Sequence, residues 1–417
     1  MGDVERNWAG NYTFRGRVHR PRTLEELQEV LSRSPKVRAL GSRHSFNDLA
    51  DSVGGDLVDL SGLSRPVDVD RVAGTVTASG STTYGALGLE LQRQGLGLHA
   101  TASLPHISVA GAIATATHGS GVGCGNLATA VSGLELVRAD GEVVHLARGD
   151  ADFDGAVVGL GALGVVTAVT LDTVPTYDVR QDVYEGLSWE ELDAHFDEIT
   201  AAAYSVSLFT GWGAQVDQVW LKSRVPAGET GSAPAEVFGA RPATRKRHPL
   251  PEMDPQNSTE QLGVPGPWID RLPHFKLEFT PSNGDEVQAE YLLPRSRAVE
   301  AVQALREVAP AFAPLLIVAE IRTVAADDLW LSTAYGHDTV ALHFTFVKEE
   351  AAVLAALLPM EEVLLPLGAR PHWGKLFRAD RTQLEGLYER LPDFRDLAKR
   401  YDPDGVFRNG FLDRYVL

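Results

Sequence analysis

Cysteine is almost absent from this sequence, and its scarcity limits the chemistry available. Cys124 is the single cysteine among 417 residues. An internal disulfide and a cysteine-rich metal site are therefore excluded, and we predict no metal centre. Any redox function needs a bound cofactor.

Long apolar runs are missing as well. No stretch approaches the roughly 18 apolar residues that would span a bilayer, and the first residues, MGDVERNWAG, lack the apolar core of a signal peptide. We therefore expect no membrane association and a cytoplasmic location.

Positive charge is in deficit: 38 Lys and Arg stand against 56 Asp and Glu, for a net charge of −18. A negative surface repels phosphate backbones and anionic lipids, so nucleic-acid and membrane partners are not expected. Hydrophobic residues make up 44% of the chain and charged residues 23%, a globular balance. The length predicts two domains.

The first half of the chain reads as short strands and helices. Thr23 followed by Glu26 predicts a helix start, and residues 84–93 predict a helix that ends before Gly95. Residues 36–40, 76–78 and 165–171 read as strands. Residues 134–138 and 143–146 predict a hairpin around Ala139-Asp140-Gly141. This half is typical of an α+β domain.

The second half, from about Val179, has longer strands. Residues 205–209 and 218–222 are examples, and they precede a loop-like stretch from Val225 to Pro267. A surface insertion without chemistry is the favoured interpretation of that stretch, and a cover over an active site is the alternative.

Two glycine-rich segments of the first half suit close approach to an anionic ligand. They are GSRHS at 41–45 and GAIATATHGSGVGCG at 111–125. Neither is GxGxxG or a P-loop, so a Rossmann site is not supported. Taken singly, each is more simply explained as a set of tight turns.

Polar residues alternate along two strands of the second half. Glu320 and Arg322 share one strand face, as do His343 and Thr345, with Phe344 and Phe346 on the opposite face. Glu320 and Arg322 suit a paired acid and base, but from the residues alone an exposed surface salt bridge is favoured.

Segments along nearly the whole chain resemble one family in consistent order. They are NWAGN (7–11), GSRHSFND (41–48), ASLPHISVAGAIATATHGSG (102–121), LGALGVVT (160–167), SVSLFTGW (205–212), GVPGPW (263–268), EIRTVAADDLWLS (320–332), HFTF (343–346), RPHWGK (370–375) and DPDGVFRNGF (402–411). The chain resembles the vanillyl-alcohol-oxidase or p-cresol-methylhydroxylase-type (PCMH-type) FAD superfamily and, within it, the bacterial alditol oxidases.

The resemblance implies a two-domain α+β fold. It implies a PCMH-type FAD-binding domain at residues 1–178 and a substrate domain at 179–374, built on an antiparallel sheet covered by helices. Residues 375–417 would return to the FAD domain. We expect a monomer.

The resemblance also implies an FAD site, with the flavin joined covalently to His44 through its 8α-methyl group. Many relatives have glycine at the position of Arg43, which either donates to the pyrophosphate or points to solvent. His118 is either a cofactor contact or a structural hydrogen-bonder. The implied cofactor-binding residues are Ala39, Leu40, Gly41, Ser42, Arg43, His44, Ser45, Ser103, Ser108, Gly111, Thr115, Thr117, His118, Val166, Arg322, His372 and Lys375.

The implied reaction is oxidation of a terminal polyol hydroxyl to the aldose, with hydride passing to flavin N5 and dioxygen becoming hydrogen peroxide. Glu320, Arg322 and Lys375 would be catalytic, with Lys375 near flavin N1. The substrate-binding residues would be Ser103, Glu320, Arg322, His343 and Thr345. A sugar-lactone oxidase or dehydrogenase is the alternative, and a non-catalytic flavin- or carbohydrate-binding protein is a more remote one.

Overall fold

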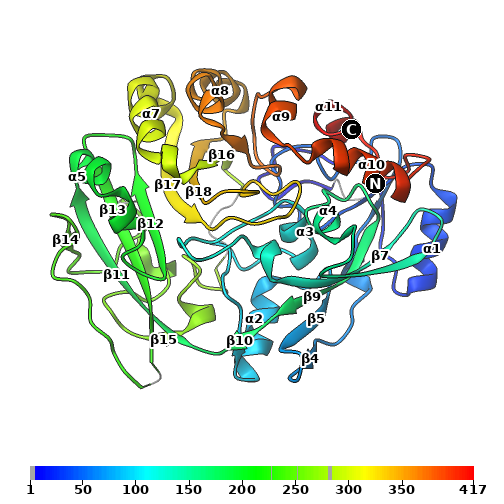
Figure 1. Cartoon of the computed structure of the whole chain (residues 1–417), viewed down its shortest axis with the longest axis horizontal. Helices are drawn as coiled ribbons and strands as arrows, with labels where there is room; N and C mark the ends of the chain where they lie inside the picture. The colour runs from blue at the N-terminus through cyan, green and yellow to red at the C-terminus, as the bar shows by residue number, and fades with distance from the viewer. Residues whose placement is uncertain (1–4, 227, 251, 280–283) are drawn as a thin grey trace.

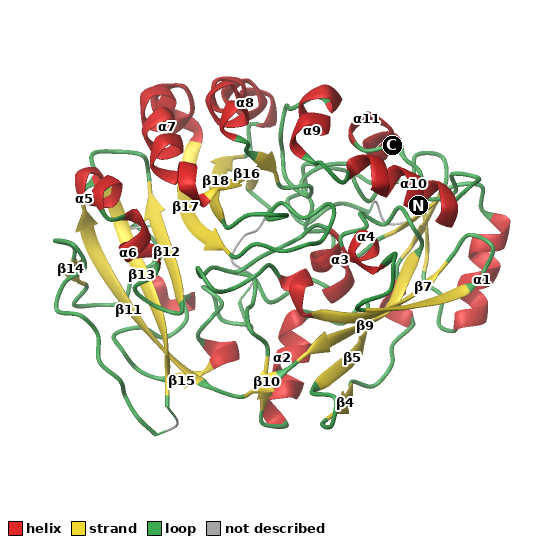
Figure 2. Cartoon of the chain, viewed as in Figure 1, coloured by secondary structure: helices red, strands yellow, loops and turns green. Residues whose placement is uncertain are grey.

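The computed structural model describes residues 5–226, 228–250, 252–279 and 284–417. Two sheet-containing halves lie side by side, with loops from both meeting between them (Figures 1 and 2). The expected α+β class and the two-part arrangement are confirmed.

An antiparallel five-stranded sheet forms the centre of the first half. In order across the sheet, its strands are β4 (Asp68–Asp70), β5 (Thr75–Ser79), β9 (Val165–Asp172), β7 (Val131–Val137) and β8 (Val143–Ala147). A parallel sheet beside it contains β1 (Arg17–His19), β3 (Asp56–Val58) and β2 (Val37–Ala39). A third sheet pairs β6 (Leu96–Gly97) with β10 (Val174–Pro175).

The helices of this half begin and end at the signals in the sequence. In α1 (Leu24–Arg33), Thr23 Oγ1 accepts a hydrogen bond from the backbone amide of Glu26, and Leu27 and Leu31 are buried. Residue Gly95, with φ of +75°, follows α2 (Tyr84–Arg93). The other helical segments are η1 (Leu60–Gly62), α3 (Val109–Ala114), η2 (Leu127–Ala130) and α4 (Phe153–Val157).

An antiparallel nine-stranded sheet forms the second half. In order, it contains β14 (Arg241–Pro242), β11 (Asp178–Leu187), β13 (Val216–Val225), β12 (Ser205–Thr210), β17 (Leu316–Val324), β18 (Thr339–Val347), β16 (Glu286–Pro294) and β19 (Arg370–Pro371), with β15 (Gly266–Pro267) paired to β11.

Helices cover one face of this sheet (Figure 2). Side chains of α7 (Ala298–Phe312) such as Val302 and Leu305 join Phe344 and Phe346 of β18 in one buried cluster. The opposite face is therefore free to carry the polar side chains of the same strands. The helical segments are α5 (Trp189–Ala194), α6 (Phe196–Thr200), η3 (Pro255–Asn257), η4 (Trp268–Asp270), η5 (Arg295–Arg297), α7 (Ala298–Phe312), η6 (Ala313–Leu315), α8 (Glu350–Leu364) and η7 (Leu365–Leu367).

The last segment of the chain packs on the first half. It contains α9 (Arg381–Leu387), α10 (Leu391–Tyr401) and α11 (Gly410–Tyr415), coloured orange to red in Figure 1. Phe394 and Phe411 join the core of the first half, and the Asn409 side chain donates to the carbonyls of Asp48, Leu49 and Asp51. The boundaries at residues 178 and 374 stay proposals.

The described residues between 225 and 267 are mostly irregular, as predicted, but the favoured interpretation of the stretch as a surface insertion is wrong for its second part. Gln218 donates to the carbonyl of His248 (2.8 Å), and Gln261 donates to the carbonyl of Arg247 (2.7 Å). These buried polar bonds hold residues 248–250 against the cavity described below.

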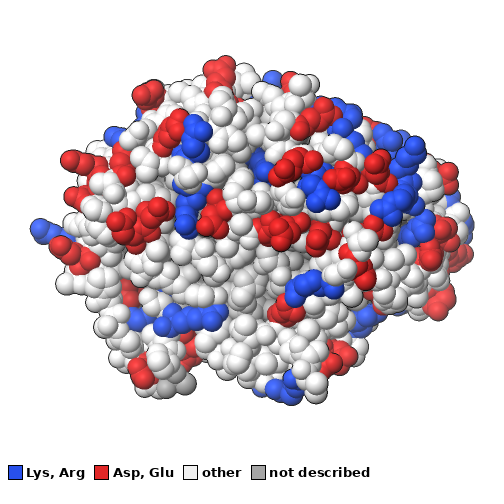
Figure 3. Space-filling view, viewed as in Figure 1, with Lys and Arg blue, Asp and Glu red and all other residues white. Residues whose placement is uncertain are grey.

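Charged side chains of both signs are interspersed on the face drawn in Figure 3, where Lys and Arg lie beside Asp and Glu. Within the described ranges, no helix is both long enough and apolar enough to cross a membrane. Among the same residues, no group of His, Cys, Asp and Glu is arranged to hold a metal ion.

Candidate active site between the two halves

A single large cavity collects the residues that the sequence singled out. Its volume is about 880 Å³, toward the upper end of the ~300–1,000 Å³ usual for ligand sites. Every candidate catalytic, substrate-binding and cofactor-binding residue lines it: Ala39, Leu40, Gly41, Ser42, Arg43, His44, Ser45, Ser103, Ser108, Gly111, Thr115, Thr117, His118, Val166, Glu320, Arg322, His343, Thr345, His372 and Lys375.

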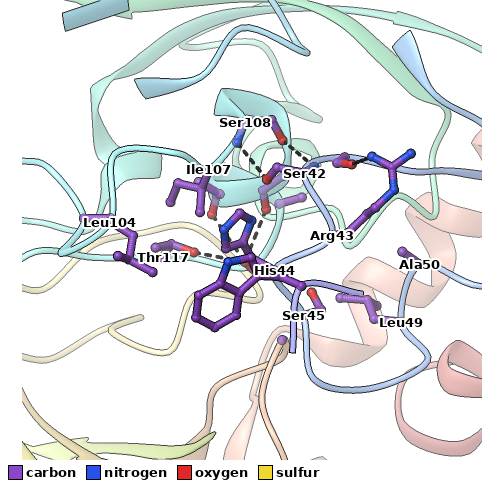
Figure 4. Close-up of a pocket in the computed structure, with 18 of the residues that line it drawn as sticks. Ser42, Arg43, His44, Ser45, Leu49, Ala50, Leu104, Ile107, Ser108 and Thr117 are labelled. Carbon is purple, nitrogen blue, oxygen red and sulfur yellow. Dashed lines mark hydrogen bonds between the residues drawn. The ribbon is translucent and has the colours of Figure 1, made fainter. Parts of the chain in front are cut away.

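The two glycine-rich segments meet at one wall of this cavity. Ser42 Oγ accepts from the amide of Ser108 (3.0 Å), and Ser108 Oγ accepts from the amide of Ser42 (3.4 Å), as Figure 4 shows. Ser108 lies just before the second segment and 66 residues from Ser42, so this meeting is a property of the fold. The explanation as separate tight turns is insufficient.

Glycines keep this wall open. A Cβ on Gly41 or Gly111 would lie 2.9 Å or 2.8 Å from Ser108 Oγ, and a Cβ on Gly80 would lie 2.5 Å from the Val166 carbonyl oxygen. All three glycines line the cavity. A side chain at any of the three positions would therefore clash with the neighbouring chain segment, so glycine allows the segments of this wall to approach closely.

His44 projects from the first glycine segment into a mostly apolar setting. Its ring stacks on Trp8 with centroids 5.4 Å apart and planes at 24°. Burial lowers the pKa of His44 to about 4, so the ring is neutral at pH 7. Among the described residues, none hydrogen-bonds the buried Nδ1 atom. An unpartnered, neutral ring nitrogen at a cavity wall is able to act as a nucleophile or as a ligand contact.

The segment NWAGN braces the His44 loop. The amide of Trp8 donates to the carbonyl of Arg43 (2.8 Å), and the side chains of Asn7 and Asn11 donate to the carbonyls of Ser45 and Phe46. The backbone on both sides of His44 is therefore fixed.

The Arg43 side chain forms ion pairs within the protein, and its predicted contact with the pyrophosphate stays a prediction. Its guanidinium pairs with Glu5 and with Asp59 (2.9 Å to Oδ2) and is directed away from His44 in Figure 4. Its φ of +64° lies in the left-handed region that favours glycine. Two carboxylates thus stabilise an arginine in a backbone conformation typical of glycine.

Three neighbouring strands, β16, β17 and β18, line the other end of the cavity. Each contributes two polar side chains from alternate positions: Gln288 and Glu290, Glu320 and Arg322, and His343 and Thr345. The exposed-salt-bridge interpretation of Glu320 and Arg322 is wrong, because both side chains are buried.

Glu290 is the charge centre of this region. Its carboxylate contacts Arg322 Nη2 (2.5 Å), Lys375 Nζ (2.8 Å) and His118 Nε2 (3.2 Å). Burial alone would raise the pKa of Glu290, but Lys375 and Arg322 hold it well below its ordinary value. The carboxylate is therefore ionised and fixes the positions of both cations.

Glu320 lies beside this cluster. Oε1 contacts His274 Nε2 at 2.8 Å, and Oε2 lies 3.6 Å from Arg322 Nε. Burial opposes ionisation of Glu320, but Arg322 and His274 outweigh it and lower the pKa. Arg322 also donates to Ser103 Oγ (3.4 Å), which joins the two halves of the protein across the cavity.

The segment RPHWGK supplies the last side of the polar cluster. The amide of His372 donates to the Glu290 carbonyl (2.9 Å), and the amide of Lys375 donates to the His372 carbonyl (3.0 Å). Burial lowers the pKa of His372 to about 3 and that of Lys375 below its usual value. In His118, Nδ1 contacts the Gly119 carbonyl at 2.8 Å.

Sequence reasoning missed Gln288, Glu290 and His274. The first two had a signal: Glu286, Gln288 and Glu290 alternate with apolar residues, which places them on one strand face. His274 had none, because it lies in an irregular segment and reaches Glu320 only through the tertiary fold.

These features fit an FAD molecule. The cavity is large, glycine-lined backbone from two segments converges on one wall, and the unpartnered Nδ1 of His44 lies beside it. A cluster of buried polar groups occupies the other end.

Two family profiles match the chain. One, described as an FAD binding domain, matches residues 16–147, and one described as D-arabinono-1,4-lactone oxidase matches residues 283–415. The first range contains both glycine segments, and the second contains the polar cluster on β16 to β18.

Curated relatives extend over the full length of the chain. An alditol oxidase of Streptomyces sp. (strain IKD472 / FERM P-14339) is 49% identical, with 99% of each chain covered. An L-gulono-1,4-lactone dehydrogenase of Mycobacterium tuberculosis (strain H37Rv) is 32% identical, with 100% of each covered. The crystal structure of cholesterol oxidase from B. sterolicum superposes with a TM-score of 0.79 at 17% identity, covering 99% of this chain and 96% of that one, which shows a shared fold.

Proposed function

Because this chain belongs to the alditol oxidase family of PCMH-type FAD-dependent oxidoreductases, we propose that it oxidises the terminal hydroxyl of an acyclic polyol such as xylitol or sorbitol to the aldose. Dioxygen is the proposed electron acceptor and hydrogen peroxide the product. The observation that carries the proposal is the paired polar side chains of β16, β17 and β18 at one end of a cavity that fits FAD.

The cofactor end of the cavity is assigned to the first half of the chain. We propose that backbone of the segments around Ser42 and Ser108 holds the pyrophosphate, and that Val166 lies toward the adenosine. When bound, FAD supplies an oxidised ring system that accepts a hydride from a carbinol carbon.

Covalent attachment through His44 belongs to the same proposal. The neutral ring, its buried Nδ1 and its stacking on Trp8 support it, since a neutral nitrogen lone pair is what such a bond requires. Acid precipitation tests it: wild-type protein is expected to stay yellow after washing, and a His44→Ala variant is expected to release its colour. Complete release from the wild type would exclude the bond.

At the polyol end of the cavity, we propose that charged side chains bind and activate the substrate. Glu320, which is ionised and lines the cavity, accepts hydrogen bonds from substrate hydroxyls, and Arg322 polarises the reacting hydroxyl. Ser103, His343 and Thr345 offer neutral donors and acceptors to the remaining hydroxyls. Lys375, held by Glu290, places a positive charge where negative charge develops during reduction.

A sugar-lactone oxidase or dehydrogenase is the second candidate. It is favoured by the lactone-oxidase profile over residues 283–415 and by the lactone dehydrogenase relative at 32% identity. The higher identity of the alditol oxidase relative, 49%, favours the polyol.

A substrate panel with peroxide detection separates the two candidates. We expect fast peroxide formation from xylitol and sorbitol and slow formation from aldono-1,4-lactones. Turnover of a lactone with no reaction of any alditol would overturn the proposal. The same preparation in air and under nitrogen with an artificial acceptor distinguishes an oxidase from a dehydrogenase.

We also propose that the protein works as a cytoplasmic monomer. The single cysteine supports an intracellular location, since disulfides are the usual stabilisation outside the cell. Light scattering after size exclusion tests the oligomeric state, and cell fractionation tests the location.

A further inference from the structure

A buried lysine continues the polar cluster beyond the cavity, through a histidine that lines the cavity wall. Lys222, on β13, is 1% exposed, and its Nζ atom lies 3.2 Å from Nδ1 of His274. Nε2 of the same imidazole lies 2.8 Å from Glu320 Oε1. One ring thus connects an ammonium group behind the cavity wall to the carboxylate at the proposed polyol site.

The hydrogen-bond capacity of Lys222 fixes the direction of these bonds. An ammonium group has three donors and accepts nothing. Nζ has three acceptors within reach: the Leu272 carbonyl (2.5 Å), the Pro273 carbonyl (3.0 Å) and His274 Nδ1. Burial lowers the pKa of Lys222 to about 7, so the ammonium form predominates below neutral pH. With Lys222 charged, Nδ1 accepts a hydrogen bond, so the ring proton lies on Nε2 and is donated to Glu320.

The same ammonium keeps the ring neutral. Burial and then the charge of Lys222 lower the pKa of His274 to about 4, against the opposing effect of Glu320. The ring is also held in place: Phe209 and Trp220 pack against it edge-on, each with centroids 5.4 Å away. His274 is thus oriented by two aromatic rings and two polar neighbours.

Protonation of His274 would change Glu320. A cationic imidazole would form an ion pair with the carboxylate and weaken its ability to accept a substrate proton or hydrogen bond. A neutral Nε2–H donor satisfies Oε1 and leaves the charge of Glu320 available at Oε2.

We propose that Lys222 is a positioning residue that acts through His274, holding the ring neutral with its proton on Nε2 so that Glu320 stays an anionic acceptor for the polyol. The inference rests on the proposed function of Glu320 and deepens it. It assigns a task to two side chains that the proposed reaction otherwise leaves unused.

The proposal predicts a particular pH dependence. The charged groups that face His274 are Lys222 from β13 and Glu320 and Arg322 from β17. Removing the ammonium, as in Lys222→Met, takes away one of the positive charges that lower the pKa of His274. That pKa is therefore expected to rise, and the acid limb of kcat/KM for the polyol is expected to move to higher pH.

Nitrogen NMR of 15N-histidine-labelled holoenzyme tests the ring state without any substrate. The His274 signals are assigned by their loss in His274→Gln. In the wild type we expect Nε2 protonated and Nδ1 unprotonated down to about pH 5, and in Lys222→Met we expect Nδ1 to gain a proton at least one pH unit higher than in the wild type. A proton on Nδ1 of the wild type at pH 6, where Lys222 is charged, or an unchanged titration in Lys222→Met, overturns the proposal.

Kinetics supply the second test. With a shift of one pH unit, Lys222→Met is expected to lower kcat/KM at pH 5 by about twofold and to regain most activity at pH 8, a modest effect beside the ~10²–10⁴-fold of direct acid–base catalysis. In a His274→Gln background the amide keeps a donor toward Glu320 but does not titrate, so Lys222→Met should no longer move the acid limb. An equal shift in both backgrounds overturns the proposal.

Lys399→Met, which removes an exposed lysine of α10, is the matched control and should change neither measurement. The two proposals fail separately. If the wild type does not oxidise polyols, the proposed function fails while the NMR result still reports the state of His274. If polyols are oxidised but the His274 titration is the same in the wild type and in Lys222→Met, only this inference fails.

Discussion

Lys375 Nζ lies 2.8 Å from Oε2 of Glu290, and Arg322 Nη2 lies 2.5 Å from Oε1 of the same carboxylate. Glu290 is 1% exposed in its side chain, so this carboxylate holds two cations in a setting with little water. The positions of Arg322 and Lys375, both proposed to act in catalysis, therefore depend on a residue outside the family motifs.

Replacing Glu290 with Gln should be costly for this reason. The substitution removes the carboxylate that Lys375 and Arg322 share and leaves Arg322 with Glu320 alone, and breaking a buried ion pair from one side typically costs about 3–5 kcal/mol. We expect a lower urea midpoint and a large loss of kcat. The measurements are equilibrium unfolding followed by fluorescence and steady-state turnover.

Glu385→Gln is the matched control for that variant. Glu385 pairs with Arg381 and Arg395 at the surface, where exposed ion pairs contribute little. We expect unchanged unfolding and turnover. Equal behaviour of the Glu290 and Glu385 variants would contradict the role given to Glu290.

Stability should fall on mild acidification. Burial lowers the pKa of His372 to about 3, and burial together with Lys222 lowers that of His274 to about 4. Below the unfolded value of about 6.5, the unfolded chain binds protons that the native rings do not, so stability is full above pH 6.5 and is lost as the pH falls toward 4. At pH 5 each ring accounts for up to about 2 kcal/mol.

Thermal unfolding of the holoenzyme between pH 7.5 and 5 measures this loss. The Tm should decrease steadily below pH 6.5, and less steeply in a His372→Asn variant, which removes one titrating ring. A Tm that stays constant over the range would show that these histidines are protonated in the native state.

Gly80→Ala should impair the cofactor wall. The new Cβ would lie 2.5 Å from the Val166 carbonyl oxygen, which is backbone and moves only with β9. We expect purified protein with reduced flavin content, read from the ratio of visible to protein absorbance. Gly123→Ala, where a Cβ meets nothing within 4 Å, should retain the wild-type ratio. Equal absorbance ratios in the two variants would show that Gly80 does not shape the cofactor site.

Arg43→Gly should be nearly neutral. Glycine relieves a left-handed backbone that costs an ordinary residue about 1–2 kcal/mol, and the lost pairs with Glu5 and Asp59 are worth roughly 0–1 kcal/mol each. We expect unchanged covalent flavin, seen as fluorescence of the denatured protein in a gel. Loss of that fluorescence would assign Arg43 a direct part in holding or attaching the cofactor.

Local signals in the sequence predicted much of this fold. Thr23 and Gly95 mark helix ends that the structure has, and the Ala139-Asp140-Gly141 turn joins the hairpin of β7 and β8. Such features depend on residues close in the sequence. The packing of residues 248–250 against the cavity depends on Gln218 and Gln261, and the nearby sequence gives no sign of it.

The candidate site divides in the same way. Alternation placed Glu320 with Arg322 and His343 with Thr345, and the family resemblance singled out His44 and Lys375, all of which line one cavity. Glu290 and His274 escaped notice because their importance comes from charges on other strands and loops. Lys222 was even harder to identify. The sequence indicates only that it lies on a strand, and its burial becomes apparent only in the folded structure.

Anaerobic titration with xylitol tests the central claim most directly. Under nitrogen, one equivalent of xylitol should bleach the visible absorbance of the bound flavin, and admission of air should restore it with one equivalent of hydrogen peroxide. An unchanged spectrum with xylitol, together with bleaching by an aldono-1,4-lactone, would contradict a polyol oxidase.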